Sequence, residues 1–292
     1  IRKMGKKNLW IGPSLGDWLA MGKGIAWQAM HNNPVSNAFI VHDLKVISET
    51  AERLGKKADA DRYRRQMEAT TEAYIRKFVS KKGIVAKDYQ SAYIMALKFV
   101  LPEGELREQV KKNFAANIRK NGLQTGFFAT EYLLPLLVEA GETELAYDIL
   151  LQEGCPGWMY QVKCGATTTW ERWDALKPDG TVNEEKMAGS GDNMVSFNHY
   201  AFGSVGEFYY QYILGIKPQK PGFAELHFEP YPDRRLGGVS GSYLSRAGKI
   251  ESSWKYEEDG CHISLNTPVK SEVVLPDGKK ETVEAGTYQW LC

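Results

Sequence analysis

The sequence predicts a mainly α-helical protein with a β domain at its C-terminal end, an α/α toroid followed by a small antiparallel β-sandwich. Between about residues 36 and 151, helical segments come in pairs with short connectors, and this αα-hairpin repeat is typical of toroids. After a Pro- and Gly-containing linker at 217–222, short β-type segments alternate with the turn pairs Asp259-Gly260 and Asp277-Gly278. The change of pattern at the linker indicates two domains.

Each helix is predicted from apolar side chains at steps of three and four residues and from a glycine or proline at its end. Residues 152–198 are weakly periodic, so we expect a long functional loop there. A last helix over Tyr200–Tyr212 closes the helical region. The helices expected before the loop are Ser36–Leu54, Ala58–Phe78, Gln90–Val100, Glu103–Lys120, Glu131–Glu139 and Glu142–Leu151.

The β domain is predicted from short segments bounded by turn residues. We place the domain limits on either side of the linker, with a helical domain at 1–217 and a β domain at 222–292. The expected β segments are Ala224–Phe228, Lys249–Tyr256, Cys261–Leu265 and Glu272–Leu275.

Charge and cysteine usage exclude several classes of function. The 37 basic and 36 acidic side chains nearly cancel, so nothing favours nucleic acid or an anionic membrane as a partner. No cysteine lies at metal-ligand spacing, and no phosphate-binding loop occurs, so we expect neither a metal site nor a cofactor. Cys155 and Cys164 would form a local disulfide or, as we favour, remain free buried thiols.

The ends and hydropathy of the chain leave its location open. The sequence has no run of about 18 apolar residues, so it does not predict a transmembrane helix. The opening at Ile1 reads like the interior of a longer protein, so we expect an N-terminal remainder of the parent chain. The sequence therefore predicts neither a compartment nor an oligomeric state.

The strongest local signal is the run Trp170-Glu171-Arg172-Trp173 in the long loop. A carboxylate between two indoles suits general acid–base chemistry. The simpler alternative is a solvated Glu171 that pairs with Arg172. The two indoles either cover the apolar face of a sugar or belong to the core, and core packing is the commoner role of a tryptophan.

Two further positions carry polar side chains that suit a binding site. His199 precedes the last predicted helix and either faces a cavity or caps that helix. Asp17 lies beside Trp18 at a loop–helix junction, where it either binds sugar hydroxyls or caps a helix.

These residues lie in motifs that strongly resemble the bacterial α-L-rhamnosidase family. The resemblance covers nearly the whole chain, and its motifs follow the family's order. They are Trp158–Asp174, Ser196–Glu207, Gly16-Asp17-Trp18-Leu19, Thr125-Gly126-Phe127 and Tyr132-Leu133-Leu134-Pro135.

The resemblance implies an (α/α)6 barrel, here partial and without its first helices, followed by a β-sandwich. It further implies inverting hydrolysis of terminal α-L-rhamnose from a rhamnose-containing oligosaccharide or glycoside. Glu171 corresponds to the general base, and His199 resembles a ligand of the sugar hydroxyls. By the same resemblance, Asp17, Trp18, Trp170 and Trp173 line the pocket.

One departure from the family pattern concerns the general acid. The family carries it in an Asp-Cys-Pro-x-Arg-x-Glu-Arg-like segment upstream of the Gly-Asp-Trp motif, and this chain has no such segment. We therefore expect the chain to be inactive alone, with an open groove and an exposed apolar inner face. The alternatives are another α/α-toroid glycosidase and a non-catalytic carbohydrate-binding remnant.

Overall fold

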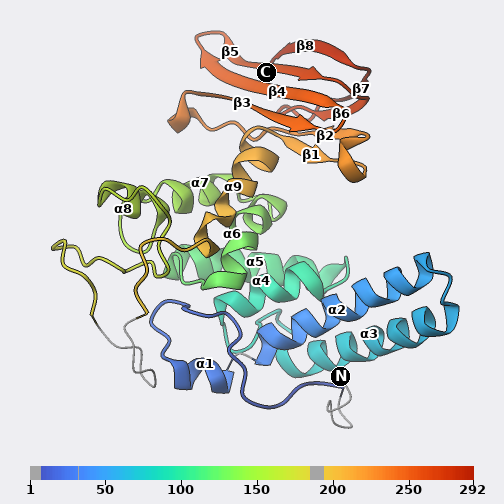
Figure 1. The fold of residues 1–292 in the computed structure, drawn as a ribbon, viewed down its shortest axis with the longest axis vertical. Helices are drawn as coiled ribbons and strands as arrows, with labels where there is room; N and C mark the ends of the chain where they lie inside the picture. The colour runs from blue at the N-terminus through green and yellow to red at the C-terminus, as the bar shows by residue number, and fades with distance from the viewer. Residues whose placement is uncertain (1–7, 32, 185–193) are drawn as a thin grey trace. The chain divides into compact units, whose positions relative to one another are not determined.

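The computed structural model describes residues 8–31, 33–184 and 194–292 (Figure 1). The chain divides into two compact units, residues 1–203 and residues 204–292, and each is described by itself. Among the described residues, no helix has both the length and the apolar character needed to cross a membrane.

The first unit consists of helical hairpins, as predicted. Consecutive helices pack against each other as antiparallel pairs, which can be followed in Figure 1: α2 with α3, α4 with α5, and α6 with α7. The helices are α1 (Ile25–His31), α2 (Asn33–Arg53), α3 (Lys57–Phe78), α4 (Gln90–Phe99), α5 (Glu105–Asn121), α6 (Phe127–Glu139), α7 (Thr143–Leu151) and α8 (Trp158–Lys163). The sequence did not predict α1 and α8, which are short.

The first helices of the three hairpins form an inner row. Helix α4 packs against both α2 and α6, while α3, α5 and α7 each cover their own partner from outside. All residues from Gln90 to Leu97 of α4 are buried, which explains why that helix is apolar on every side. The outer helix α5 instead buries one face and exposes most of its charged residues, with Arg107 as the buried exception.

Helix α6 begins at Phe127, four residues before the predicted start at Glu131. The residue that caps it is Asp17, more than a hundred positions away in the chain, so no local signal marks this start. The loop expected over 152–198 also contains structure, since α8 and an isolated bridge between Leu176 and Val182 interrupt it.

The last predicted helix is broken rather than continuous. It forms a 3-10 turn η1 (Ala201–Ser204), a single turn α9 (Val205–Phe208) and a π-helical turn η2 (Tyr209–Ile213). Its final carbonyl groups bond the β unit: Trp254 Nε1 donates to the Ile213 oxygen at 2.7 Å and Ser252 Oγ to the Leu214 oxygen at 2.6 Å. These bonds explain why the second compact unit begins before the linker.

The second unit is a β-sandwich of two four-stranded sheets, with strand orders β1-β2-β6-β7 and β3-β4-β5-β8. All strand pairs are antiparallel except β2–β6, which is parallel and departs from the predicted antiparallel pattern. The ring of Phe228 on β2 stacks on that of Trp290 on β8, so the sheets pack face to face. The strands are β1 (Ile216–Pro218), β2 (Leu226–Phe228), β3 (Gly238–Ser245), β4 (Gly248–Glu257), β5 (Gly260–Thr267), β6 (Ser271–Val274), β7 (Lys280–Val283) and β8 (Gly286–Leu291).

The four cysteines are free thiols. Only Cys261 is buried, whereas Cys155 is exposed and Cys164 is half-buried. The expectation of buried thiols is therefore wrong for Cys155, which lies in the open connection before α8. Even so, partial burial raises the pKa of the Cys155 thiol to about 11.

Candidate active site

Asp17 is a fully buried carboxylate that joins two inner helices. Its Oδ2 accepts hydrogen bonds from Ser91 Oγ at 2.5 Å and from the Gly126 amide at 2.7 Å. Its Oδ1 accepts from the amides of Phe128 at 2.8 Å and Ala129 at 3.0 Å. Ser91 belongs to the first turn of α4, and the three amides belong to the start of α6, so a single side chain ties the two helix N-termini together.

This geometry decides between the two roles considered for Asp17. With none of its surface exposed and four donors around it, the carboxylate has no free oxygen face for a sugar. Burial raises the pKa of Asp17, and the hydrogen bonds from Ser91 and the α6 amides pull it back by favouring the ionised form. Asp17 is thus a helix cap, which corrects the expectation that it lines the pocket.

The backbone at the start of α6 lies directly against the loop that carries Trp18. The Phe127 amide donates to the Trp18 carbonyl at 2.9 Å. A Cβ on Gly126 would lie 2.1 Å from that same carbonyl oxygen, so only glycine allows the approach. Residue 19 of the loop is a leucine at φ 58°, a strained conformation that persists only where the surroundings fix it.

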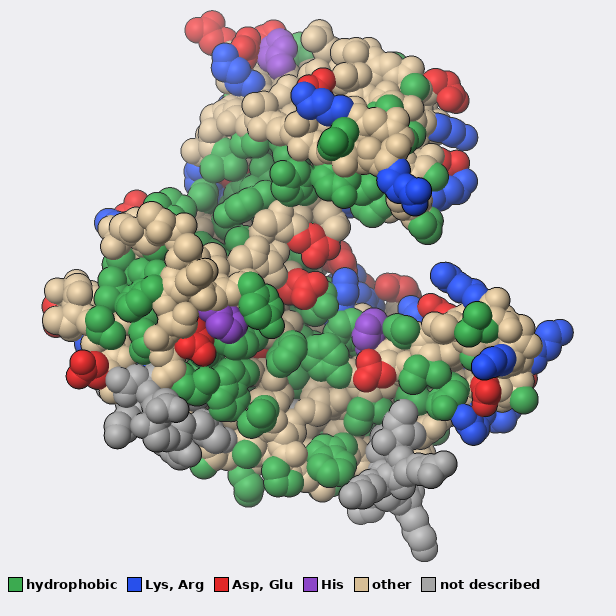
Figure 2. All heavy atoms as spheres, in the orientation of Figure 1, with side chains coloured by type: hydrophobic (Ala, Val, Ile, Leu, Met, Phe, Trp, Pro, Cys, Tyr) green, Lys and Arg blue, Asp and Glu red, His purple; other side chains and the backbone are tan. Residues whose placement is uncertain are grey.

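Trp18 is half-buried and borders a hollow of about 610 Å³ on the inner helices. Exposed apolar side chains such as Leu15 and Phe128 surround it, which matches the expected exposed apolar inner face. Figure 2 shows this surface as hydrophobic side chains over α2 and α6. The lining residues are Leu15, Gly16, Trp18, Ser36, Phe39, Ile40, Asp43, Phe127 and Phe128.

Glu171 and His199 lie on two irregular segments that are hydrogen-bonded to each other. The Glu171 amide donates to the Ser196 carbonyl at 2.9 Å, and the His199 amide donates to the Thr169 carbonyl at 2.9 Å. Thr169 Oγ1 also donates to the His199 carbonyl at 2.6 Å. The fold therefore pairs two segments whose candidate residues, Glu171 and His199, are 28 positions apart in the sequence. Neither of them lines the hollow beside Trp18.

The Glu171 side chain is half-buried, and its carboxylate makes no hydrogen bond or ion pair with any residue that the structure describes. Arg172 turns to Asp174 instead, with Nε and Nη2 each 2.9 Å from one carboxylate oxygen. The simpler alternative, an ion pair between Glu171 and Arg172, is therefore wrong.

The two indoles that flank Glu171 in the sequence are core residues. Trp173 has no exposed surface; it stacks on Phe202 at 3.8 Å between ring centroids and donates from Nε1 to the Thr125 carbonyl at 2.9 Å. Trp170 is 2% exposed and meets Tyr160 and Phe197 edge to face. Rings buried to this extent have no face left for a sugar, which corrects the expectation that they line the pocket.

The His199 ring has a defined environment. Its Nδ1 accepts a hydrogen bond from the Ala201 amide at 3.3 Å, so a neutral ring carries its proton on Nε2. One face stacks on Phe127 at 4.6 Å between centroids, and Tyr200 stacks on it at 5.0 Å. His199 is half-buried and thus keeps access to solvent.

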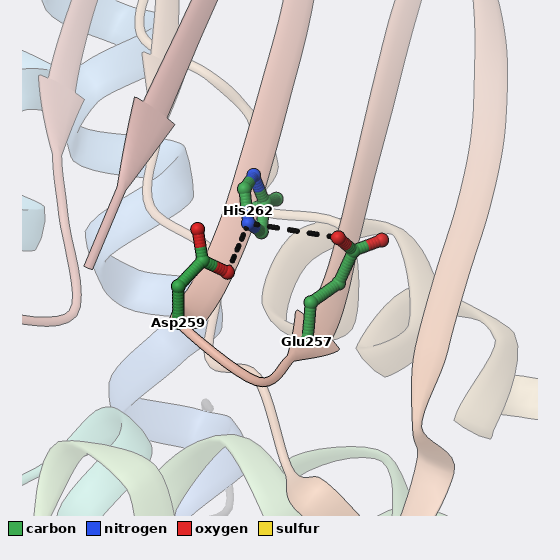
Figure 3. A group of neighbouring side chains, drawn as sticks. All are labelled: Glu257, Asp259 and His262. Carbon is green, nitrogen blue, oxygen red and sulfur yellow. Dashed lines mark hydrogen bonds and ion pairs between the residues drawn. The ribbon is translucent and has the colours of Figure 1, made fainter.

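Among the described residues, one group has the spacing of metal ligands: Glu257, Asp259 and His262 at the β4–β5 hairpin (Figure 3). All three are exposed. His262 Nε2 lies 2.7 Å from Asp259 Oδ1, and Glu257 accepts a hydrogen bond from Lys255. These surface pairs account for the cluster without a metal ion.

Models of two protein families match the chain in succession. The bacterial α-L-rhamnosidase 6-hairpin glycosidase domain matches residues 1–213, and the bacterial α-L-rhamnosidase C-terminal domain matches residues 215–289. The chain belongs to the bacterial α-L-rhamnosidase family. Its helical hairpins belong to the six-hairpin glycosidase domain of that family, and its sandwich matches the family's C-terminal domain.

Individual relatives agree with the family assignment. An α-L-rhamnosidase of Alteromonas sp. is 34% identical over 93% of this chain, and one of Streptomyces avermitilis is 32% identical over 92%. The crystal structure of the Streptomyces avermitilis α-L-rhamnosidase complexed with L-rhamnose superposes with a TM-score of 0.88 at 29% identity, over 99% of this chain and 29% of the other. The chain spans 30% and 25% of the length of the two sequence relatives.

Sequence reasoning did not single out Phe127, which lies between Trp18 and His199. Phe127 borders the hollow beside Trp18, and its ring stacks on His199. The sequence did contain a signal, since Phe127 lies in one of the family motifs, but no role was assigned to it and the predicted helix began only at Glu131. Only the fold shows that Phe127 touches both halves of the site.

Proposed function

We propose that this chain supplies the general base and the sugar-binding residues of an inverting α-L-rhamnosidase. The observation that supports the proposal most is the pairing of the segments of Glu171 and His199, together with the absence of a described partner for the Glu171 carboxylate. A general base needs a carboxylate that is free to accept a proton from water.

In the proposed mechanism, Glu171 takes a proton from a water molecule as that water attacks the anomeric carbon of rhamnose. Attack from the face opposite the leaving group inverts the configuration. His199 donates from Nε2 to a sugar hydroxyl, because its Nδ1 already accepts the Ala201 amide. The half-buried indole of Trp18 covers an apolar face of the ligand.

Inversion also requires a general acid roughly 6.5–9.5 Å from the base. We propose that a segment outside residues 1–292 contributes this acid, because the family's acid-bearing motif does not occur in the sequence. The 292-residue chain then binds rhamnose but hydrolyses rhamnosides very slowly or not at all. Within the chain, we propose domain limits of 1–217 for the catalytic part and 222–292 for the sandwich.

The test uses Glu171→Gln in a parent enzyme that contains this chain. We expect kcat to fall at least ~10²-fold with little change in substrate binding, which is the scale of a lost general base. The control is Glu153→Gln, which removes an exposed carboxylate paired with Lys163 and should leave kcat unchanged. A Glu171→Gln enzyme with near-normal kcat would exclude the assigned role.

The product stereochemistry tests the mechanism separately. NMR of the first sugar released from an aryl α-L-rhamnoside should show the β-anomer, and release of the α-anomer would contradict inversion. A panel of other aryl glycosides distinguishes a rhamnosidase from another α/α-toroid glycosidase. Failure of the chain to bind L-rhamnose would argue against both sugar-binding assignments, His199 and Trp18.

A further inference from the structure

We propose that Asp17 and Phe127 are positioning residues that hold His199 in the site, with Asp17 fixing the start of α6 and Phe127 transmitting that position to the imidazole. The inference rests on the role proposed above for His199. In this proposal the buried Asp17 does not touch the sugar; it acts on binding through the helix start that it caps.

The first step is the rigidity of the α6 start. Asp17 accepts the amides of Gly126, Phe128 and Ala129, which are donors that an α-helix leaves without intrahelical partners. The remaining amide of this turn, that of Phe127, donates to the Trp18 carbonyl. Each amide from 126 to 129 is therefore bonded to the segment that contains Asp17 and Trp18.

The second step is a further anchor from the Glu171 loop. Trp173 Nε1 donates to the carbonyl of Thr125, directly before Gly126, and the Trp173 indole is fully buried. The turn that carries Phe127 is thus held from one side by Asp17 and from the other by a residue two positions after Glu171. It cannot shift without breaking bonds to both segments.

The third step is the contact with His199. The Phe127 and His199 rings are nearly parallel, 25° apart, with centroids 4.6 Å apart. Opposite the ring, the His199 backbone is fixed to Thr169 by two hydrogen bonds. The ring of Phe127 therefore limits the rotation of the imidazole and sets the direction of Nε2. Sub-ångström placement of such a group matters for binding and catalysis.

The experiment uses the 292-residue chain and three variants: Asp17→Asn, Phe127→Leu and the control Arg107→Gln. Asparagine keeps the shape of Asp17 but turns one acceptor into a donor that faces the α6 amides. Arg107 is also a buried charged residue, yet it bonds the carbonyls of Leu97 and Leu101 at the opposite end of α4. The control thus matches the loss of a buried charge without touching the α6 start.

Two readouts separate positioning from folding. The first is the ¹H,¹³C NMR signals of the His199 ring, assigned with His199→Asn, because the stacked Phe127 ring shifts the ring protons upfield. The second is the Kd for L-rhamnose, measured well below each variant's Tm. We expect Asp17→Asn and Phe127→Leu to move the His199 signals downfield and to weaken binding about tenfold. Arg107→Gln should lower Tm but change neither readout.

The outcomes are distinguishable. Unchanged His199 signals in a folded Asp17→Asn chain would overturn the proposal, whatever happens to Tm. If Asp17→Asn does not fold, Phe127→Leu decides through the Kd for L-rhamnose, because loss of the aromatic ring moves the His199 signals whether or not the imidazole turns: binding must weaken while the Phe128 and Ala129 amides stay protected from exchange. If wild type does not bind L-rhamnose, the proposed function fails, but the His199 signals of Asp17→Asn still decide whether Asp17 positions His199.

Discussion

Arg172 and Asp174 form a bidentate ion pair in the loop that carries Glu171. Both N–H···O distances are 2.9 Å, and Asn183 Nδ2 donates to the same carboxylate at 2.9 Å. This pairing keeps a guanidinium adjacent in sequence to Glu171 from serving as its counterion. A general base held in a tight ion pair would be a weaker proton acceptor, so Asp174 supports the chemistry proposed for Glu171.

We predict that Asp174→Asn lowers kcat/KM of the parent enzyme about tenfold, because Arg172 then loses its charged partner and can swing towards Glu171. The steady-state kinetics of an aryl rhamnoside measure this. The matched control is Asp179→Asn in the same loop. The Asp179 carboxylate is exposed and accepts hydrogen bonds from the amide and the hydroxyl of Thr181. Equal activities of the two variants would contradict the prediction.

The close approach of Gly126 to the Trp18 loop predicts a large effect of a single methyl group. In Gly126→Ala the new Cβ would meet the Trp18 carbonyl oxygen at 2.1 Å, so the backbone must move. We expect a loss of about 1–3 kcal/mol in the free energy of unfolding, the usual cost of overpacking. Urea denaturation measures it against Gly154→Ala, where the added Cβ meets nothing within 4 Å. A Gly126→Ala chain as stable as the control would show that the loop yields easily.

How much of the fold followed from the sequence depends on how local its cause is. The helices from α2 to α7 were predicted within a few residues because apolar spacing and stop residues mark them. Helix α6 was predicted to begin too late, since its cap Asp17 comes from a distant loop. The parallel pairing of β2 with β6 joins strands more than 40 residues apart, and no turn signal encodes it.

The site shows the same division. The Glu171 and His199 segments were singled out from residue types and from the family resemblance. Their pairing through Ser196 and Thr169 is a property of the fold. Burial was the quantity that the sequence could not supply: Trp173 and Asp17 look like sugar ligands in a one-dimensional motif, but neither has any exposed surface.

The burial of Trp173 leads to a prediction about stability rather than affinity. Trp173→Phe removes the hydrogen bond to the Thr125 carbonyl and part of the stack on Phe202. We expect a loss of about 2–4 kcal/mol in the free energy of unfolding, from an unsatisfied buried acceptor and a partly filled space. Because the three bonds to Asp17 still hold the turn of Phe127, the L-rhamnose Kd, measured on the folded fraction, should change less than about threefold. A variant that is as stable as wild type but binds L-rhamnose much more weakly would instead indicate that Trp173 contacts the sugar.

A partly buried cluster of charged side chains in the sandwich predicts that the stability of this domain depends on pH. Glu229 Oε2 lies 3.0 Å from Lys217 Nζ and 3.2 Å from His227 Nε2. The hydrogen bond from His227 is the largest influence on Glu229 and lowers its pKa from 4.5 to about 2. The same bond raises the pKa of His227 above its ordinary 6.5, with Glu272 adding to the effect from β6.

The signs give a stability maximum between about pH 4.5 and 6.5. A carboxylate with a lowered pKa stabilises the fold above its unfolded value of about 4.5, and this is lost as the pH falls towards 2. A histidine with a raised pKa stabilises the fold below about 6.5, and this is lost as the pH rises through its folded pKa. Glu229→Gln should therefore destabilise the sandwich most inside this window.

Urea titrations from pH 3 to 9, followed by the methyl NMR signals of the buried Ile250 and Ile263, measure this difference. The matched control is Asp259→Asn, which breaks the His262–Asp259 pair of the same sandwich. That pair is exposed to solvent, so screening leaves it little influence on stability. We expect a clear pH-dependent gap between wild type and Glu229→Gln and almost none for Asp259→Asn. Parallel curves for the two variants would mean that the half-buried position of Glu229 contributes nothing beyond a surface ion pair.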